Sequence, residues 1–194
     1  METKTVYFDN PGNENTDDVL RIAKQRAKEL GIKTIVIAST HGDTAVKAVE
    51  ALSGFRLIVV SHSTGFREPD VQEFTEENRQ IVESKGVPIV TAAHAFGGIS
   101  RALRQGDIPE ARQTYVVGDL IAHTLRIFGQ GMKVACEIAV MAADAGLVRT
   151  DEEVISIAGT GRLRGADTAI VLKPETAHRF FDLRVKEILC KPRF

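Results

Sequence analysis

Two patterns of hydrophobic and polar positions alternate along the chain. Short, continuous apolar runs, such as residues 34–38 and 57–60, are typical of strands that are covered on both faces of a sheet. Between such runs, apolar residues recur at helical spacing, as in residues 16–30, where Gly31 follows as a stop signal. We expect Thr16 to cap this helix through its hydroxyl group. The alternation predicts strands and helices that follow one another in turn.

The same reading extends to most of the chain. It predicts strands at 5–8, 34–38, 57–60, 88–91, 154–158 and 169–172, and helices at 16–30, 45–52, 75–86, about 99–105, about 109–128 and about 133–146. The tail is predicted to form a short helix near 177–181 and then a strand. Strands that alternate with helices indicate a mainly parallel sheet with helices on both faces, a three-layer α/β fold. Because no linker or low-complexity segment interrupts the chain, we expect residues 1–194 to form a single domain.

The composition of the chain indicates which kinds of binding partner to expect. The 25 basic and 26 acidic residues give a formal net charge of -1, without the basic excess that nucleic-acid binding requires. The N-terminus soon becomes polar, which does not resemble a signal peptide, and no apolar run approaches the roughly 20 residues needed to cross a membrane. We therefore expect a cytoplasmic protein whose partner is a small molecule rather than nucleic acid or a membrane. The chain could form a homo-oligomer.

Hydroxyl groups, glycines and histidines gather where the predicted strands end. In a parallel sheet, ligands bind beyond the carboxyl ends of the strands, so these residues are candidates for one shared site. Helix capping alone is the alternative explanation for part of this enrichment. The candidates are Asn10, Ser39, Thr40, His41, Gly42, Thr44, His62, Ser63, Thr64, Gly65, Thr91, His94, Gly159, Thr160, Gly161 and Arg162.

The loop at residues 39–44 has the most specific chemistry. A glycine between hydroxyl residues allows a tight turn whose N–H groups face an anion, and the following helix adds the positive end of its dipole. We therefore predict a phosphate site here, although Asp43 must then face solvent or a cation. A Walker-type phosphate loop is absent, and the glycines at 159–161 lack the spacing of a dinucleotide fingerprint. Arg162 and Arg164 either clamp an anion or face solvent on a hairpin.

Two further groups of ionisable residues leave alternatives open. His41, His62 and His94 all follow strand ends, where they could hold zinc, contact a ligand, or be ordinary loop residues. We assign no metal ligand among them. Glu137 and Asp144 lie in an otherwise apolar helix, either paired inside the protein or, as we favour, on a solvent-facing stripe.

These residues resemble the C-terminal α/β domain of pyruvate kinases. Residues 34–44 are similar to the strand and loop that hold the phosphate of a regulatory sugar phosphate in that family, and residues 154–172 are similar to its late strand, glycine-rich loop and return strand. The chain looks like the small stand-alone proteins related to that domain. Pyruvate kinase activity is not implied, because the resemblance does not extend to the catalytic barrel, which needs roughly 250 residues.

The resemblance implies a flavin ligand. The stand-alone relatives look like binders of flavin mononucleotide (FMN), whose phosphate would suit the loop at 39–44 and whose ring would suit an apolar wall such as Phe66 or Phe96. We therefore predict a binder of FMN or a related phosphoester, compatible with a flavin-dependent oxidoreductase or a flavin carrier. A regulatory module that senses a phosphorylated metabolite is the first alternative. A zinc hydrolase that uses the three histidines is the second.

Overall fold

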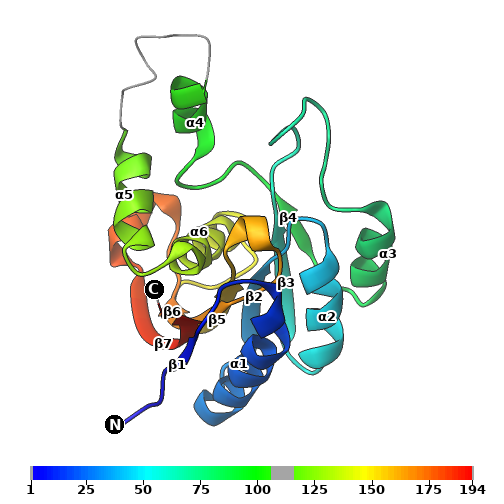
Figure 1. The fold of residues 1–194 in the computed structure, drawn as a ribbon, viewed down its shortest axis with the longest axis vertical. Coiled ribbons are helices and arrows are strands. Elements are labelled where there is room, and N and C mark those ends of the chain that lie inside the picture. The colour runs from blue at the N-terminus through cyan, green and yellow to red at the C-terminus, as the bar shows by residue number, and fades with distance from the viewer. Residues whose placement is uncertain (1, 106–115, 194) are drawn as a thin grey trace.

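The protein, described by a computed structural model over residues 2–105 and 116–193, has one seven-stranded sheet at its centre (Figure 1). The strand order is β1-β7-β6-β5-β2-β3-β4. Their bounds are β1 Val6–Phe8, β2 Thr34–Ala38, β3 Arg56–Ser61, β4 Ile89–Thr91, β5 Val154–Ala158, β6 Thr168–Lys173 and β7 Arg184–Pro192.

Only β6 runs against the other strands of this sheet. β2 is parallel to both β3 and β5, and β3 is parallel to β4. β6 is antiparallel to β5 and β7, while β1 is parallel to β7. The carboxyl ends of six strands therefore meet at one rim, which is the rim that the sequence predicted for the ligand site.

Helices cover both faces of the sheet and form the expected three layers (Figure 1). One layer contains α1 Thr16–Leu30, α2 Asp43–Ala51 and α3 Glu76–Ser84, and the other contains α5 Val117–Arg126 and α6 Gln130–Asp144. Helix α4, Gly98–Gln105, lies beyond the end of α5, away from the centre of the sheet (Figure 1). Short 3-10 helices occupy Asn13–Asn15, Gly161–Leu163 and Ala177–Asp182.

Alternate residues of the central strands pack into two separate hydrophobic cores. Ile35 and Ile37 of β2 lie under α1 and α2, whereas Val36 faces α6 on the opposite side. Because both faces are covered, these strands are apolar at consecutive positions, which is why their sequences are continuous runs. The second core depends on α6, whose small buried residues allow close packing against the sheet.

The structure corrects several details of the sequence reading. Asn15, rather than Thr16, is the N-cap of α1, and no side chain caps this helix. The 3-10 turn before the helix directs the Thr16 hydroxyl elsewhere, and its Oγ1 accepts a hydrogen bond from the Ala166 N–H. The long helix predicted at 109–128 is described only as α5, since residues 106–115 lie outside the described part. The tail strand is longer than expected and lies inside the sheet, between β1 and β6.

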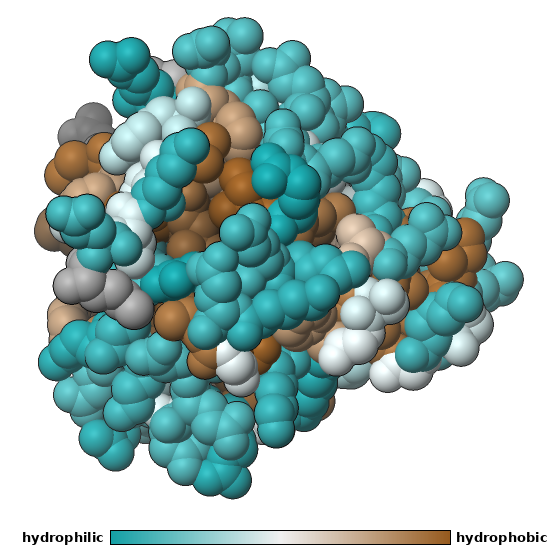
Figure 2. Space-filling view, turned by 90° about the horizontal axis from the view of Figure 1, so that it is seen from below, coloured by the Kyte–Doolittle hydropathy of each residue, from teal (hydrophilic) through white to brown (hydrophobic). Residues whose placement is uncertain are grey.

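The surface agrees with a fold whose apolar residues are mostly enclosed. Viewed from below the orientation of Figure 1, polar side chains cover most of the visible face, and hydrophobic residues show in the hollows between them (Figure 2). Within residues 2–105 and 116–193, no helix has both the length and the apolar character needed to cross a membrane.

Candidate functional site

A cavity of about 950 Å³ lies at the carboxyl ends of β2, β3 and β5. Strand order reverses here, because the chain passes from β2 to β3 on one side and later returns to β5 on the other. This reversal separates the loops that follow β2 and β5 and leaves space between them, which is where ligands bind in open α/β sheets. Helix α6 forms the opposite wall of the cavity.

Ten of the sixteen residues predicted for the site line this cavity. They are Ser39, Thr40, His41, Thr44, His62, His94, Gly159, Thr160, Gly161 and Arg162. The other six, Asn10, Gly42, Ser63, Thr64, Gly65 and Thr91, are not on its wall. Thr91 Oγ1 lies 2.8 Å from Ser61 Oγ, and the Asn10 carbonyl accepts a hydrogen bond from Asn15, so both stabilise the loops behind the site.

The loop at residues 39–44 makes a tight turn at Gly42, as the sequence suggested. Gly42 has a φ of 103°, and a β-carbon there would lie 2.3 Å from Asn78 Cβ. This position therefore faces Asn78 of α3 and not the cavity. Ser39 Oγ accepts a hydrogen bond from the Ala45 N–H, which fixes the loop against the first turn of α2. Asp43 is turned toward a cation, with its Oδ2 3.6 Å from the Arg164 guanidinium. The start of α2 thus meets the cavity with its positive end.

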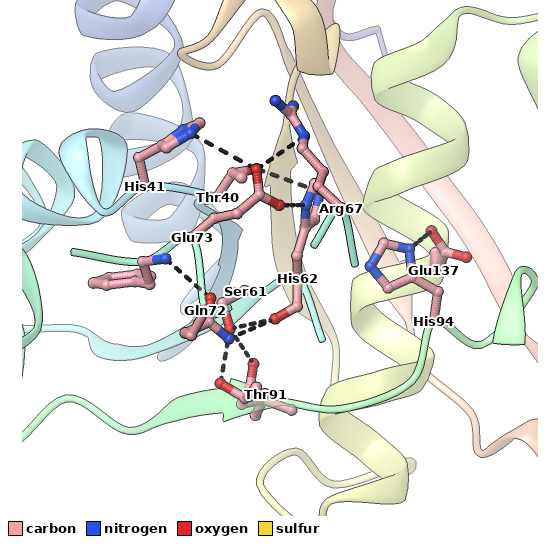
Figure 3. A network of polar contacts seen from close by, with 12 residues as sticks. Thr40, His41, Ser61, His62, Arg67, Gln72, Glu73, Thr91, His94 and Glu137 are labelled. Atoms are coloured by element: carbon pink, nitrogen blue, oxygen red, sulfur yellow. Dashed lines mark hydrogen bonds and ion pairs between the residues drawn. The ribbon is translucent and has the colours of Figure 1, made fainter. Parts of the chain in front are cut away.

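Glu73 joins three basic side chains at one edge of the cavity (Figure 3). Its Oε2 lies 2.7 Å from His62 Nδ1, while its Oε1 lies 3.0 Å from Arg67 Nε and 3.8 Å from His41 Nε2. Because Glu73 is largely buried, these contacts fix the loop that follows β3 and hold His62 in one orientation. His62 Nε2 is then left 3.4 Å from Thr40 Oγ1 at the cavity wall.

Phe66 forms an aromatic stack near the same edge. Its ring lies 4.7 Å from that of His94, nearly parallel to it, and 4.1 Å from that of His62. The Arg101 guanidinium carbon lies 3.8 Å from the centre of the Phe66 ring. Phe66 therefore lines the cavity as expected but already packs against three neighbours, whereas Phe96 lies outside this cavity.

Lys133 and Glu137 form a buried ion pair on the wall provided by α6. The Glu137 carboxylate also accepts a hydrogen bond from the Phe96 N–H and lies 3.9 Å from His94 Nδ1 (Figure 3). The favoured expectation of a solvent-facing stripe was wrong for Glu137, because its helix face packs on the sheet. It holds for Asp144, which is exposed and accepts a hydrogen bond from the Ala177 N–H.

Burial changes the protonation of these groups. Desolvation lowers the pKa of His94 to about 4, an effect that the Glu137 carboxylate opposes. The imidazole is therefore neutral near pH 7. Desolvation also lowers the pKa of Lys133 from its usual range, and Glu137 again favours the charged form.

Basic side chains outnumber acidic ones on the described wall of the cavity. The basic residues are Arg67, Arg101, Arg126, Lys133, Arg162 and Arg164, and the acidic ones are Asp43 and Glu137. Of the basic set, the sequence drew attention only to Arg162 and Arg164. Both are exposed on the loop that follows β5, as one of the alternatives expected, and both also line the cavity.

The histidines do not form a metal centre in the described part of the chain. No group of three or more histidine, cysteine, aspartate or glutamate side chains is placed there to hold a metal ion. His62 and His94 approach each other, with ring centres 5.1 Å apart, but His62 is bound to Glu73 and His94 packs on Phe66. This geometry does not favour the zinc alternative.

Taken together, the fold and this cavity define a three-layer α/β protein with a basic pocket where the strand order reverses. Residues 17–172 match the family model described as pyruvate kinase, alpha/beta domain. The chain therefore belongs to the family of the pyruvate kinase α/β domain.

Proposed function

We propose that the protein binds a phosphorylated small molecule in the large cavity, and that this ligand is FMN. The observation that carries the proposal is a single cavity of about 950 Å³ whose wall combines basic and hydroxyl side chains with apolar ones. That volume is near the upper end of the usual range for small-molecule sites, so a nucleotide-sized ligand would fit.

The loop at residues 39–44 is the proposed phosphate site. In the first turn of α2, the Ala45 N–H already donates to Ser39 Oγ, so the proposed phosphate donors are the N–H groups of Asp43 and Thr44. The helix dipole also favours an anion at this end. Thr40 and Thr44 add hydroxyl donors on the same wall, and Arg162 lies on the facing loop after β5. Asp43 repels an anion here less than an isolated carboxylate would, because the Arg164 guanidinium lies beside it.

The face of α6 is the proposed site for the flavin ring. Val134, Ile138 and Met141 line the cavity from this helix, and Ala38 and Val60 do so from the ends of β2 and β3. Phe66 is less open to a new aromatic partner, because Arg101 and His94 already pack on its ring. An isoalloxazine ring would therefore gain most of its apolar contact from α6.

A spectrum of purified protein tests the ligand class. FMN should give a yellow protein, or an apoprotein that takes up FMN on titration. Uptake of sugar phosphates but not of FMN would instead favour the alternative of a module that senses a phosphorylated metabolite. Failure to bind either ligand would contradict the proposal as a whole.

Replacing Thr44 tests the phosphate position. Thr44→Val keeps the side-chain shape but removes one hydroxyl donor, and buried hydrogen bonds to charged groups contribute about 1.5–3 kcal/mol. FMN affinity should therefore fall roughly tenfold or more, whereas riboflavin, which lacks the phosphate, should be nearly unaffected. Both ligands can be titrated by quenching of flavin fluorescence.

Thr64→Val is the matched control for this change, because Thr64 is exposed and does not line the cavity. It should leave both affinities unchanged. Equal losses of FMN and riboflavin in Thr44→Val would mean that Thr44 contacts another part of the ligand or only supports the helix, and the proposed phosphate position would then be wrong.

A further inference from the structure

A second, smaller cavity of about 320 Å³ adjoins the large one. Five residues line both cavities: Phe66, His94, Arg101, Arg126 and Lys133. The remaining wall of the small cavity comes from the loop after β4 and from α4 and α5, which lie on the same side of the molecule (Figure 1). A ligand in the small cavity would therefore lie next to one in the large cavity.

The basic groups of the small cavity lie on the shared wall. Arg101, Arg126 and Lys133 are all part of that wall, and Glu137 partly neutralises Lys133. One carboxylate, that of Asp119, also lines the small cavity, and its residue is only 2% exposed. The described lining therefore contains three basic groups, two of them arginines, and one carboxylate.

The rest of the small cavity is mainly apolar. Ala93, Phe96, Ile99 and Ala122 line it together with Gly97 and Gly98, and Ser63 adds one hydroxyl group. An aromatic and aliphatic lining beside two guanidinium groups suits a ligand that has an apolar body and an anionic end.

We propose that the small cavity binds a small organic carboxylate with an apolar body, side by side with the phosphorylated ligand. The inference rests on the proposed function, since it assigns a second ligand class to the same composite site. Two features favour a carboxylate. Guanidinium groups pair with carboxylates through parallel hydrogen bonds, and the cavity is too small for a second nucleotide-sized molecule.

The position of Lys133 agrees with two neighbouring ligands. Its ammonium group lies 5.7 Å from the centre of the Phe96 ring, on the wall between the cavities, and its bond to Glu137 keeps it there. A carboxylate bound beside it would favour its charged form, which burial alone disfavours. Lys133 would then lie between the carboxylate and the flavin ring proposed on α6.

Benzoate is a suitable probe, because it combines a flat apolar ring with a carboxylate. We would titrate benzoate and benzyl alcohol by calorimetry into the full chain, both ligand-free and saturated with FMN. We expect benzoate to bind in both cases without displacing FMN, and benzyl alcohol to bind at least tenfold more weakly because it lacks the charge.

Two matched variants test the location. Ala93 and Ala92 are both exposed, but only Ala93 lines the small cavity, so Ala93→Phe adds bulk at that cavity and Ala92→Phe makes the same change at a position that lines neither cavity. We expect Ala93→Phe to weaken benzoate binding roughly tenfold or more and to leave FMN affinity nearly unchanged. Ala92→Phe should change neither.

The outcomes separate this inference from the proposed function. Absence of benzoate binding, displacement of FMN by benzoate, or equal effects of the two variants would overturn the second site even if FMN binds. If FMN itself does not bind, the proposed function is wrong, and the titrations of ligand-free protein still decide whether the small cavity takes a carboxylate.

Discussion

His94 shows how one residue can connect the site with the stability of the fold. Its imidazole lies between the two cavities, packs on Phe66, and lies 3.9 Å from the Glu137 carboxylate. Burial lowers its pKa to about 4, whereas an exposed histidine titrates near 6.5. The unfolded chain therefore binds a proton at a higher pH than the folded protein does, and stability should decrease as the pH falls from 6.5 toward 4.

This pH dependence can be measured with a single substitution. At pH 5, the His94 contribution should destabilise the protein by about 2 kcal/mol relative to pH 7.5, and His94→Gln should remove that part of the loss. Denaturant unfolding of ligand-free protein at the two pH values provides the comparison. His178→Gln, at an exposed position, should retain the full pH dependence. If His94→Gln loses as much stability as the wild type between these pH values, the imidazole is not desolvated.

At the residue scale, the sequence predicted the site residues on the loops after the strands better than those on the helices. Ser39, Thr44 and Gly161 could be found because they lie within a few residues of the ends of apolar strands, which is a local pattern. Lys133, Arg101 and Arg126 could not be found in this way. They come from helices, and only the packing of those helices on the sheet decides which helix face meets the cavity. The acidic residue in the apolar stretch of α6, Glu137, was the available signal for a buried pair.

At the scale of elements, the loop after β5 offers a test of binding against folding. Gly161 begins the 3-10 helix Gly161–Leu163, has a φ of 22°, and lines the large cavity. A β-carbon at this position would have no neighbour within 4 Å, so the fold itself leaves room for a side chain. Gly161→Val should therefore weaken FMN binding strongly, because the new side chain narrows the cavity, whereas the melting temperature should fall only by the backbone strain that a positive φ imposes.

Gly146→Val is the appropriate control for that substitution. Gly146 has a φ of 70° and equally open surroundings, but it follows α6 and does not line the cavity. It should lower the melting temperature through backbone strain while leaving FMN affinity unchanged. Parallel losses of affinity and stability in Gly161→Val would indicate that the glycine is structural and that the ligand lies elsewhere.

The sequence predicted whether a segment forms a helix or a strand where the pattern is local, but it did not predict the residues at which these elements begin and end. The start of α6 was expected near residue 133 but lies at Gln130, because Gly129, with a φ of 118°, ends the preceding turn. The reversed direction of β6 follows from the short, glycine-rich connection at residues 159–167, which leaves no room for a crossover helix. The position of β7 inside the sheet depends on pairing with β1, nearly the whole chain away, which no local pattern encodes.

At the scale of the whole molecule, the first helix is tied to the last strand. Arg26 of α1 donates from Nε to Glu187 Oε2 over 2.8 Å and from Nη2 to Glu187 Oε1 over 2.7 Å. Both side chains are mostly covered, with 16% and 17% exposure. Arg26 also pairs with Glu29 on its own helix, but that carboxylate is 45% exposed. One guanidinium group thus makes a long-range contact and a local contact that can be compared directly.

The comparison predicts different costs for removing the two carboxylates. Glu187→Gln disrupts a partly buried, two-point pair that spans the chain, and should destabilise the protein by about 1–3 kcal/mol in denaturant unfolding. Glu29→Gln removes a more exposed partner three residues away, and should cost no more than about 0.5 kcal/mol.

The pair with Arg26 lowers the pKa of Glu187, so the contribution of this pair to stability is present above pH 4.5 and is lost as the pH falls through the lowered value. The stability difference between wild type and Glu187→Gln should therefore be constant from pH 6 to 8 and shrink in strong acid. If the two substitutions cost the same at pH 7, the pair does not stabilise the attachment of α1 to β7.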